Sequence, residues 1–168
     1  YKFNEAIRTL YEFIWNDFCD WYLEIIKPRL YNTDEKESRM VAQKALVYVL
    51  NNTLHLLHPF APFMTEEIWQ YLKSMVAQNR TIAVDSMKNE SLMICTWPEI
   101  DSTQIDKKVM DTMPLLQDLI RAVRNIRSNM NIPNKTPLKA IISVHDNEIK
   151  TRLDSHHGFI VQMANLDG

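Results

Sequence analysis

The sequence predicts a mainly α protein, a helical bundle of four helices followed by a small, truncated α/β appendage at the C-terminus. Over most of the chain, apolar residues recur at steps of three and four, the spacing of one face of an α-helix. Only two of the 168 residues are glycine, so tight turns and phosphate-binding glycine loops lack their usual residue. After residue 134 the apolar period changes to two, which is typical of a β-strand. We therefore expect the bundle in residues 1–130 and the appendage in residues 131–168.

A first helix is predicted from residue 3 onward, because apolar residues fall on one helical stripe. The stripe consists of Phe3, Ile7, Leu10, Ile14, Phe18, Trp21 and Ile25. Pro28 is expected to end this helix. A second helix should begin after Asn32, with Asp34 as its N-cap and Glu37 as the capping-box partner. Its first turns carry basic residues and its far end is apolar, so we expect the basic end to be exposed and the far end buried.

Pro59 and Pro62 are expected to form an extended corner before a third helix, which Thr65 would cap. The inner face of this helix is predicted to comprise Ile68, Trp69, Leu72 and either Met75 or Val76. Residues 80–100 are predicted to be an irregular linker. Two of its segments, 81–84 and 92–96, have the composition of short strands.

The fourth helix is predicted from a further apolar stripe. The stripe consists of Ile105, Val109, Met113, Leu116, Leu119, Val123, Ile126 and Met130. Pro114 predicts a kink or a fresh helix start. A strand should follow over residues 138–144, after which Asp146 should cap a short helix that Gly158 separates from another. Because one strand cannot form a sheet, we expect the appendage to be cut before its partner strands, and the chain, which has no initiator Met, to be a piece of a larger protein.

Bulk properties restrict the possible functions. The formal net charge of −2 argues against a general nucleic-acid binder, so any RNA site must be local. Cys19 and Cys95 have neither metal-ligand spacing nor a nearby Cys or His, which favours a reducing, cytoplasmic compartment. Neither a signal peptide nor an apolar run of about 20 residues occurs, so we expect a soluble protein without a membrane partner.

Enzyme and metal chemistry are not favoured. Asp20 and Glu24 share a helix face and could form an acid/base pair, but a structural role explains them better. His55 and His58 have the spacing of two metal ligands on one helix, yet no third ligand accompanies them. We interpret His58 as a cap of the carbonyls at the end of the second helix. No catalytic, cofactor-binding or metal-binding residue is predicted.

Two groups of polar and basic residues remain as candidate RNA contacts. Lys36, Arg39 and Gln43, with Tyr31 and Asn32 ahead of them, combine donors and an aromatic ring at one helix start. Such residues can hydrogen-bond and stack with unpaired bases. In the fourth helix Arg121, Arg124 and Arg127 recur every third position, and Lys135 follows. These residues either face water or contact RNA phosphates, which positions RNA without reading its sequence.

Several motifs connect the chain to a known family. The matching segments are residues 1–6, 11–16, Phe18-Cys19-Asp20-Trp21-Tyr22-Leu23-Glu24 with Lys27-Pro28, 58–70, Arg121-Ala122-Val123-Arg124-Asn125-Ile126-Arg127 and 129–133. In this order and spacing they strongly resemble the anticodon-binding domain of valyl-tRNA synthetases, a class I family. The 58–70 corner is also similar to isoleucyl and leucyl enzymes, so the other segments carry the assignment to valine.

The resemblance implies a recognition role within a larger enzyme. By analogy the domain holds the anticodon stem-loop of valine tRNA, with Lys36, Arg39 and Gln43 near the loop and Arg121, Arg124 and Lys135 on the phosphates or on a neighbouring domain. The parent enzyme would use ATP with Mg to attach valine to tRNA and would edit threonine, because a valine-sized pocket rejects that isostere only about a hundredfold. The adenylate-forming motifs, the editing domain, the first helix of the bundle with its anticodon-reading arginine, and the coiled coil of the family are absent from this sequence. The fragment itself should therefore be inactive, and should expose apolar surface between Tyr1 and Ile14.

Two alternatives remain. The first is the corresponding domain of an isoleucyl enzyme, which usually continues to a zinc-binding C-terminus instead of an Arg-Asn-Ile-Arg helix. The second is a helical protein-interaction module with no RNA role. An apolar groove along the first helix, and no more affinity for tRNA than an acidic domain has, would distinguish that module.

Overall fold

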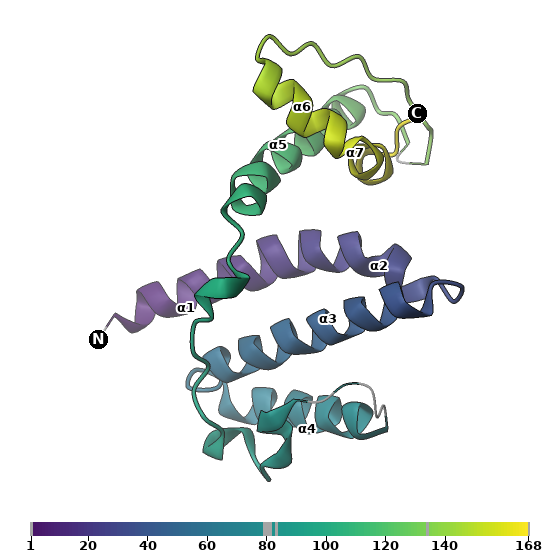
Figure 1. Ribbon diagram of the computed structural model, residues 1–168. Coiled ribbons are helices and arrows are strands. Elements are labelled where there is room, and N and C mark those ends of the chain that lie inside the picture. Colours follow the sequence, from purple (N-terminus) through teal and green to yellow (C-terminus); the bar gives the residue numbers. More distant parts are fainter. Residues whose placement is uncertain (1, 79–81, 83, 134, 168) are drawn as a thin grey trace. The chain divides into compact units, whose positions relative to one another are not determined.

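The computed structural model describes residues 2–78, 82, 84–133 and 135–167 (Figure 1). The predicted mainly α class is confirmed, since the described residues form helices joined by turns and contain no β-strand. The chain divides into two compact units, residues 1–100 and 101–168. The sequence analysis placed the boundary between bundle and appendage at residue 130. In the structure the helix of residues 107–129 belongs to the second unit. No helix in the described part is both long and apolar enough to cross a bilayer.

The first unit begins with one continuous helical segment. It comprises α1 (Phe3–Glu12), the π-helix η1 (Phe13–Tyr22) and α2 (Leu23–Tyr31). Phe18, Trp21 and Ile26 are buried along it. The prediction that Pro28 ends the helix is wrong, because the helix continues to Tyr31. Proline disfavours helical angles in the residue before it and removes its own N–H, but its fixed φ is compatible with further helix after it.

The turn between α2 and α3 (Lys36–Leu57) is organised by Asn32. Its Oδ1 atom accepts hydrogen bonds from the amides of Asp34, at 2.9 Å, and Glu35, at 3.3 Å. The predicted capping box of Asp34 and Glu37 is wrong, since α3 has no side-chain cap. An asparagine two residues earlier offers the same acceptor chemistry in an Asx-turn and takes these amides instead.

The corner before α4 (Pro62–Gln78) is a turn and not an extended segment. Pro62 is the first residue of α4, a position at which the missing N–H costs little. Thr65 therefore does not cap the helix. Its buried hydroxyl donates to the carbonyl of Ala61, at 2.9 Å, and lies 2.8 Å from Nδ1 of His58. His58 is the C-cap of α3, as predicted, and its amide donates to the carbonyl of Leu54 at 2.9 Å. Its side chain bonds Thr65 of the next helix and not the carbonyls of α3.

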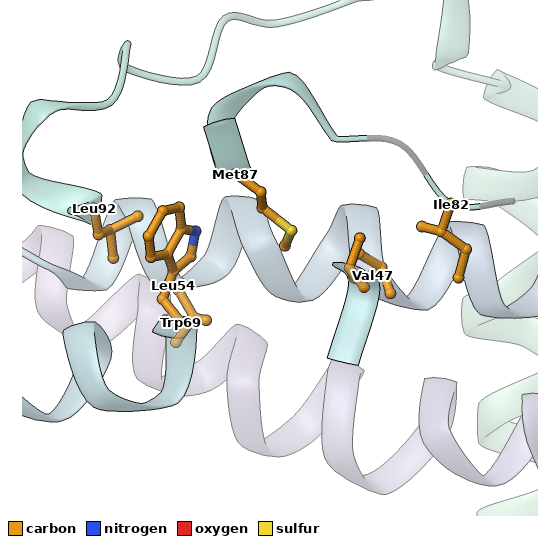
Figure 2. Close-up of a cluster of buried hydrophobic side chains, with 7 residues drawn as sticks. Val47, Leu54, Trp69, Ile82, Met87 and Leu92 are labelled. Carbon is orange, nitrogen blue, oxygen red and sulfur yellow. The ribbon is translucent and has the colours of Figure 1, made fainter. Parts of the chain in front are cut away.

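Apolar residues of the segment that follows α4 pack onto the core of the first unit. Ile82, Met87 and Leu92 are buried against α3 and α4, where they join the cluster shown in Figure 2. The other members of this cluster are Val47, Leu54, Trp69 and Val76. The predicted linker is therefore part of the core. The predicted strand at 92–96 is wrong, because η3 (Leu92–Ile94) is a 3-10 helix, as is η2 (Asp85–Lys88); the predicted strand at 81–84 includes positions outside the described residues.

One face of α4 holds this segment by hydrogen bonds to its backbone. Gln70 donates to the carbonyl of Glu90 and Lys73 to the carbonyl of Asn89, each at 2.6 Å. The carboxylate of Glu66 accepts from the hydroxyl of Ser91 and the amide of Leu92, each at 3.0 Å. The predicted inner face is confirmed for Trp69 and Val76, which are buried, and for Leu72, which packs against them. It is wrong for Ile68, which is exposed, and of the two alternatives Met75 and Val76 the structure selects Val76. Thr65 is also buried.

The second unit contains η4 (Ser102–Gln104), α5 (Lys107–Asn129), α6 (Asn147–Ser155) and α7 (His157–Ala164). Leu116, Leu153 and Ile160 form its buried apolar cluster. α5 passes through Pro114 without a fresh start. The prediction that Asp146 caps α6 is confirmed, because its carboxylate accepts from two amides of the first turn.

Two predictions for this unit are wrong. Residues 138–144 do not form a strand; Leu138 makes a single parallel bridge to Leu166, and the amide of Asp167 donates to the carbonyl of Leu138 at 2.8 Å. Period-two patterning alone cannot form a strand when no neighbouring strand pairs with it. Gly158 does not separate the last two helices, since it lies inside α7 and the break falls at His156.

Asparagine takes the place of glycine at two helix ends of the second unit. Asn131 after α5 and Asn165 after α7 adopt positive φ angles of 52° and 51°. After α5, the amide of Ile132 donates to the carbonyl of Arg127 at 2.9 Å, and the amide of Asn131 donates to that of Ser128 at 3.1 Å. This pair of bonds is a Schellman motif. A chain with two glycines thus ends helices with the next residue that tolerates left-handed angles.

Candidate nucleic-acid interface

The first predicted site lies at the start of α3. At about 100° per residue, Lys36, Arg39 and Gln43 fall on one face of the helix. Lys36 is exposed, whereas Arg39 and Gln43 are half-buried, so the predicted exposure holds only for the first of the three. The Nε atom of Arg39 is buried and has no hydrogen-bond partner in the described part of the chain. The structure thus brings these three side chains together as one row of donors.

Neighbouring residues of the α2–α3 hairpin divide into structural and exposed ones. Asn32 is engaged in the turn, while Tyr31 is 78% exposed and its ring is available for stacking. Arg29, to which the sequence assigned no role, donates to the hydroxyl and the carbonyl of Ser38, both at 3.0 Å. Burial raises the pKa of Tyr22, and the positive charge of Arg29 opposes that shift. Arg29 of α2 therefore adds positive charge beside the start of α3. Its position there depends on the packing of α2 against α3 and could not be read from the sequence.

The second predicted site belongs to the other unit and is described separately. Arg121, Arg124 and Lys135 are all exposed. Arg121 forms an ion pair with Asp118 at 3.1 Å, and Arg124 donates to the carbonyl of Met163 at 3.0 Å. Arg127, the third arginine of the repeat, is only 2% exposed, so it cannot take part in a surface site. Among the described residues, the repeat thus contributes two exposed arginines and one buried one.

The sequence interval that contains the residues of this second site has no acidic residue. No Asp or Glu occurs between Asp118 and Asp146, whereas three arginines, Lys135 and Lys139 fall inside that interval. Lys139 is exposed as well. The local excess of positive charge is hidden by the net charge of −2 for the whole chain, and a windowed charge count along the sequence would have found it.

The other candidate chemistry has structural explanations. His55 is buried and its Nδ1 lies 2.8 Å from the carbonyl of Asn51, whose side chain accepts a hydrogen bond from Trp69. Glu24 forms an ion pair with Lys27. Both cysteines are free. No group of three or more potential metal ligands occurs among the residues that the structure describes.

An apolar groove runs beside α1. Phe3, Ala6 and Leu10 form one side of it, and Leu56, Phe60 and Trp97 contribute further apolar surface. Its volume is about 490 Å³. Phe3 and Tyr11 are more than half exposed on the same helix, so apolar surface is exposed between residues 2 and 14 as expected; Tyr1 lies outside the described residues.

A helical scaffold with a row of donors on one unit and exposed arginines and lysines on the other offers the side chains that nucleic-acid-binding domains use on phosphates and bases. Comparison with known proteins identifies the family. The model of the family described as "Anticodon-binding domain of tRNA ligase" matches residues 1–142, and the chain belongs to this family.

Curated relatives agree with this assignment. The chain is 43% identical to valine–tRNA ligase of Listeria monocytogenes and 39% identical to those of Anoxybacillus flavithermus and Bacillus subtilis, in each case over 165 residues. Each match covers 98% of this chain and 17% of the relative. The chain therefore spans about one sixth of the length of these relatives.

Proposed function

We propose that the chain is the anticodon-binding domain of a valine–tRNA ligase and that it holds the anticodon stem-loop of valine tRNA. The observation that carries this proposal is the similarity to valine–tRNA ligases along 98% of the chain, together with the family match over residues 1–142. The resemblance of the segment from Phe18 to Glu24 supports valine over isoleucine. Recognition of an anticodon suits a helical surface, because the unstacked bases of a loop expose their hydrogen-bonding edges.

In this proposal the two predicted sites contact different parts of the RNA. Lys36, Arg39 and Gln43 would bind bases or phosphates of the loop, since the lysine and arginine side chains are pure donors and glutamine both donates and accepts. Arg121, Arg124 and Lys135 would contact backbone phosphates. The absence of Asp and Glu from residues 119–145 supports this, because the local excess of positive charge would attract phosphates, even though Asp118 pairs with Arg121.

The proposal extends to a parent enzyme in the cytoplasm. That enzyme would activate valine with ATP and Mg and transfer it to tRNA, through catalytic, editing and coiled-coil domains outside this chain. In line with the resemblance, ATP would be bound by the catalytic domain of that enzyme, and the contribution of this chain would be to bind and orient the tRNA.

The test is binding of the 168-residue chain to the anticodon stem-loop of a valine tRNA, compared with the same stem-loop carrying a changed anticodon, in a salt titration. We expect tighter binding to the valine anticodon and a linear fall of log K with log salt. Lys36→Gln should weaken binding, whereas Lys107→Gln is the matched control, because Lys107 is also an exposed first residue of a helix. Equal, weak affinity for both stem-loops would contradict anticodon recognition by this chain.

A further inference from the structure

Arg127 is the most deeply buried charged side chain among the described residues. It lies near the end of α5 and is 2% exposed. Neither Asp nor Glu is among its hydrogen-bond partners. A buried charge without a carboxylate is costly unless several polar groups solvate it, so the partners of this guanidinium must be sought among the backbone carbonyls.

Its guanidinium binds three backbone carbonyls from two separate segments. Nη1 donates to the carbonyl of Thr136 at 2.7 Å and more weakly to that of Pro133 at 3.4 Å, and Nη2 donates to that of Asn165. The first two carbonyls lie on either side of Lys135 in the sequence. The third belongs to the left-handed residue at the end of α7, where the helix dipole favours a positive charge. Arg127 therefore ties the segment around Lys135 to the end of α7.

These hydrogen bonds from Arg127 take the place of the strand pairing that the segment around Lys135 lacks. The described residues between α5 and α6 form one isolated bridge, at Leu138, and no strand. Lys135 itself is exposed, and its neighbours are anchored by Arg127 and by the hydrogen bond from the amide of Thr136 to the carbonyl of Pro133. Without the guanidinium, the direction in which Lys135 projects would be set by few other contacts.

We propose that Arg127 is a positioning residue of the RNA-binding surface: it holds the segment that carries Lys135 so that this lysine reaches an RNA backbone phosphate. The inference rests on the proposed function and adds to it a buried residue that cannot touch the RNA. It explains why the third arginine of the repeat points inward while Arg121 and Arg124 remain exposed.

A double-mutant cycle tests the proposal, with the dissociation constant and its salt dependence for the valine anticodon stem-loop as readouts. Arg127→Lys keeps the charge of the chain, so a lower salt slope in this variant can come only from a displaced cation. We expect Lys135→Ala alone to weaken binding about fivefold to tenfold at 0.1 M salt and to lower the slope by about one. Arg127→Lys should have a similar effect, and adding Lys135→Ala to it should cause little further loss. Arg121→Ala is the control, whose effect should be equal in both backgrounds.

Amide hydrogen exchange provides a measurement that needs no RNA. Arg127→Lys should speed exchange at Thr136 and Asp167, while the amides of the α5 interior stay protected. Leu153→Ala, which destabilises the same unit without touching Arg127, should leave the affinity unchanged at a temperature where both variants are folded. Unchanged exchange, or additive losses from Arg127→Lys and Lys135→Ala, would overturn the positioning role. If Lys135→Ala had no effect in the parent chain while Lys36→Gln weakened binding, the positioning role would fall but anticodon recognition would stand.

Discussion

The two units hold their irregular segments in different ways. In the first unit several side chains of α4 share this role: Gln70 and Lys73 donate to the carbonyls of Glu90 and Asn89, and the carboxylate of Glu66 accepts from the amide of Leu92. In the second unit a long irregular segment joins α5 to α6, and the single buried side chain of Arg127 donates to its backbone carbonyls and to that of Asn165. A segment without helical or strand pairing thus depends on side-chain partners, which either several residues or one arginine can supply.

The units also differ in charge. Residues 1–100 contain 10 Lys and Arg against 13 Asp and Glu, a net charge of −3, and residues 101–168 contain 9 against 8, a net charge of +1. The acidic first unit would contact RNA at one helix start, whereas the second would contact it through the basic residues of the interval 119–145, which contains no Asp or Glu. Salt dependence should therefore arise mainly from the second unit and base preference from the first.

The largest effect should follow from Trp69→Ala in the first unit. Trp69 is completely buried, and truncating a buried tryptophan costs about 3–5 kcal/mol. All four tryptophans lie in the first unit, so the fluorescence of the remaining three reports its unfolding in urea alone. Backbone NMR signals of residues 101–168 should persist after the fluorescence transition. Simultaneous loss of both signals would show that the units unfold as one.

Arg127→Met should destabilise the second unit and leave the first unit unchanged. It removes the donors to three carbonyls in the second unit, which should cost about 2–3 kcal/mol. The urea midpoint of tryptophan fluorescence should be unchanged, while exchange-derived stabilities of α5 and α7 should fall. If the fluorescence midpoint shifted while the α5 amides kept their protection, the prediction that the two units unfold independently would be wrong.

A smaller effect is expected at the helix end next to Arg127. Asn131 has a φ of 52°, and an ordinary side chain in this region costs about 1–2 kcal/mol. Asn131→Ala should therefore destabilise the second unit by about 1 kcal/mol, and Asn131→Gly should be neutral or slightly stabilising. Hydrogen exchange at the Ile132 amide, which closes the Schellman motif, measures both. If Asn131→Ala and Asn131→Gly changed the stability equally, the positive φ angle of this residue could not be the cause of the change.

The smallest effect concerns the pH dependence of the first unit. Burial acts to raise the pKa of Glu66, but hydrogen bonds from Gln70, Ser91 and the Leu92 amide, with the charge of His58, outweigh it and hold the pKa below its usual value. A lowered folded-state pKa contributes stability above the unfolded pKa of about 4.3, and this stability is lost as the pH falls through the folded value.

Glu66→Gln should accordingly lower the free energy of unfolding at pH 7 by about 0.5–1.5 kcal/mol, the value of a lost hydrogen bond. It should also flatten the acid limb of the stability curve measured by fluorescence. Glu67→Gln, at the exposed neighbouring position, is the matched control and should leave that limb unchanged. An identical acid limb in the Glu66 variant would show that the segment is held without this carboxylate.

Local features of the sequence determined the helical class, most of the helices and the family. Periods of three and four located α3, α4 and α5, and Asp146 was recognised as a cap, because a helix and its caps depend on residues within a few positions of one another. The motifs between residues 1 and 133 led to the family for the same reason, since each of them is a contiguous segment. The two groups of candidate RNA contacts were also found from residue type and spacing alone, and their roles stay predictions.

Tertiary structure decided what depends on residues far apart in the chain. Whether Arg127 faces water or three carbonyls is set by Thr136 and Asn165, which no helical periodicity relates to it. The packing of Ile82 and Leu92 on the core and the absence of a strand at 138–144 likewise depend on which segments meet. The type of a side chain and its spacing in the sequence indicate what it can bind. Its actual partner is determined by the fold, because burial and hydrogen bonding act between residues that are neighbours in space.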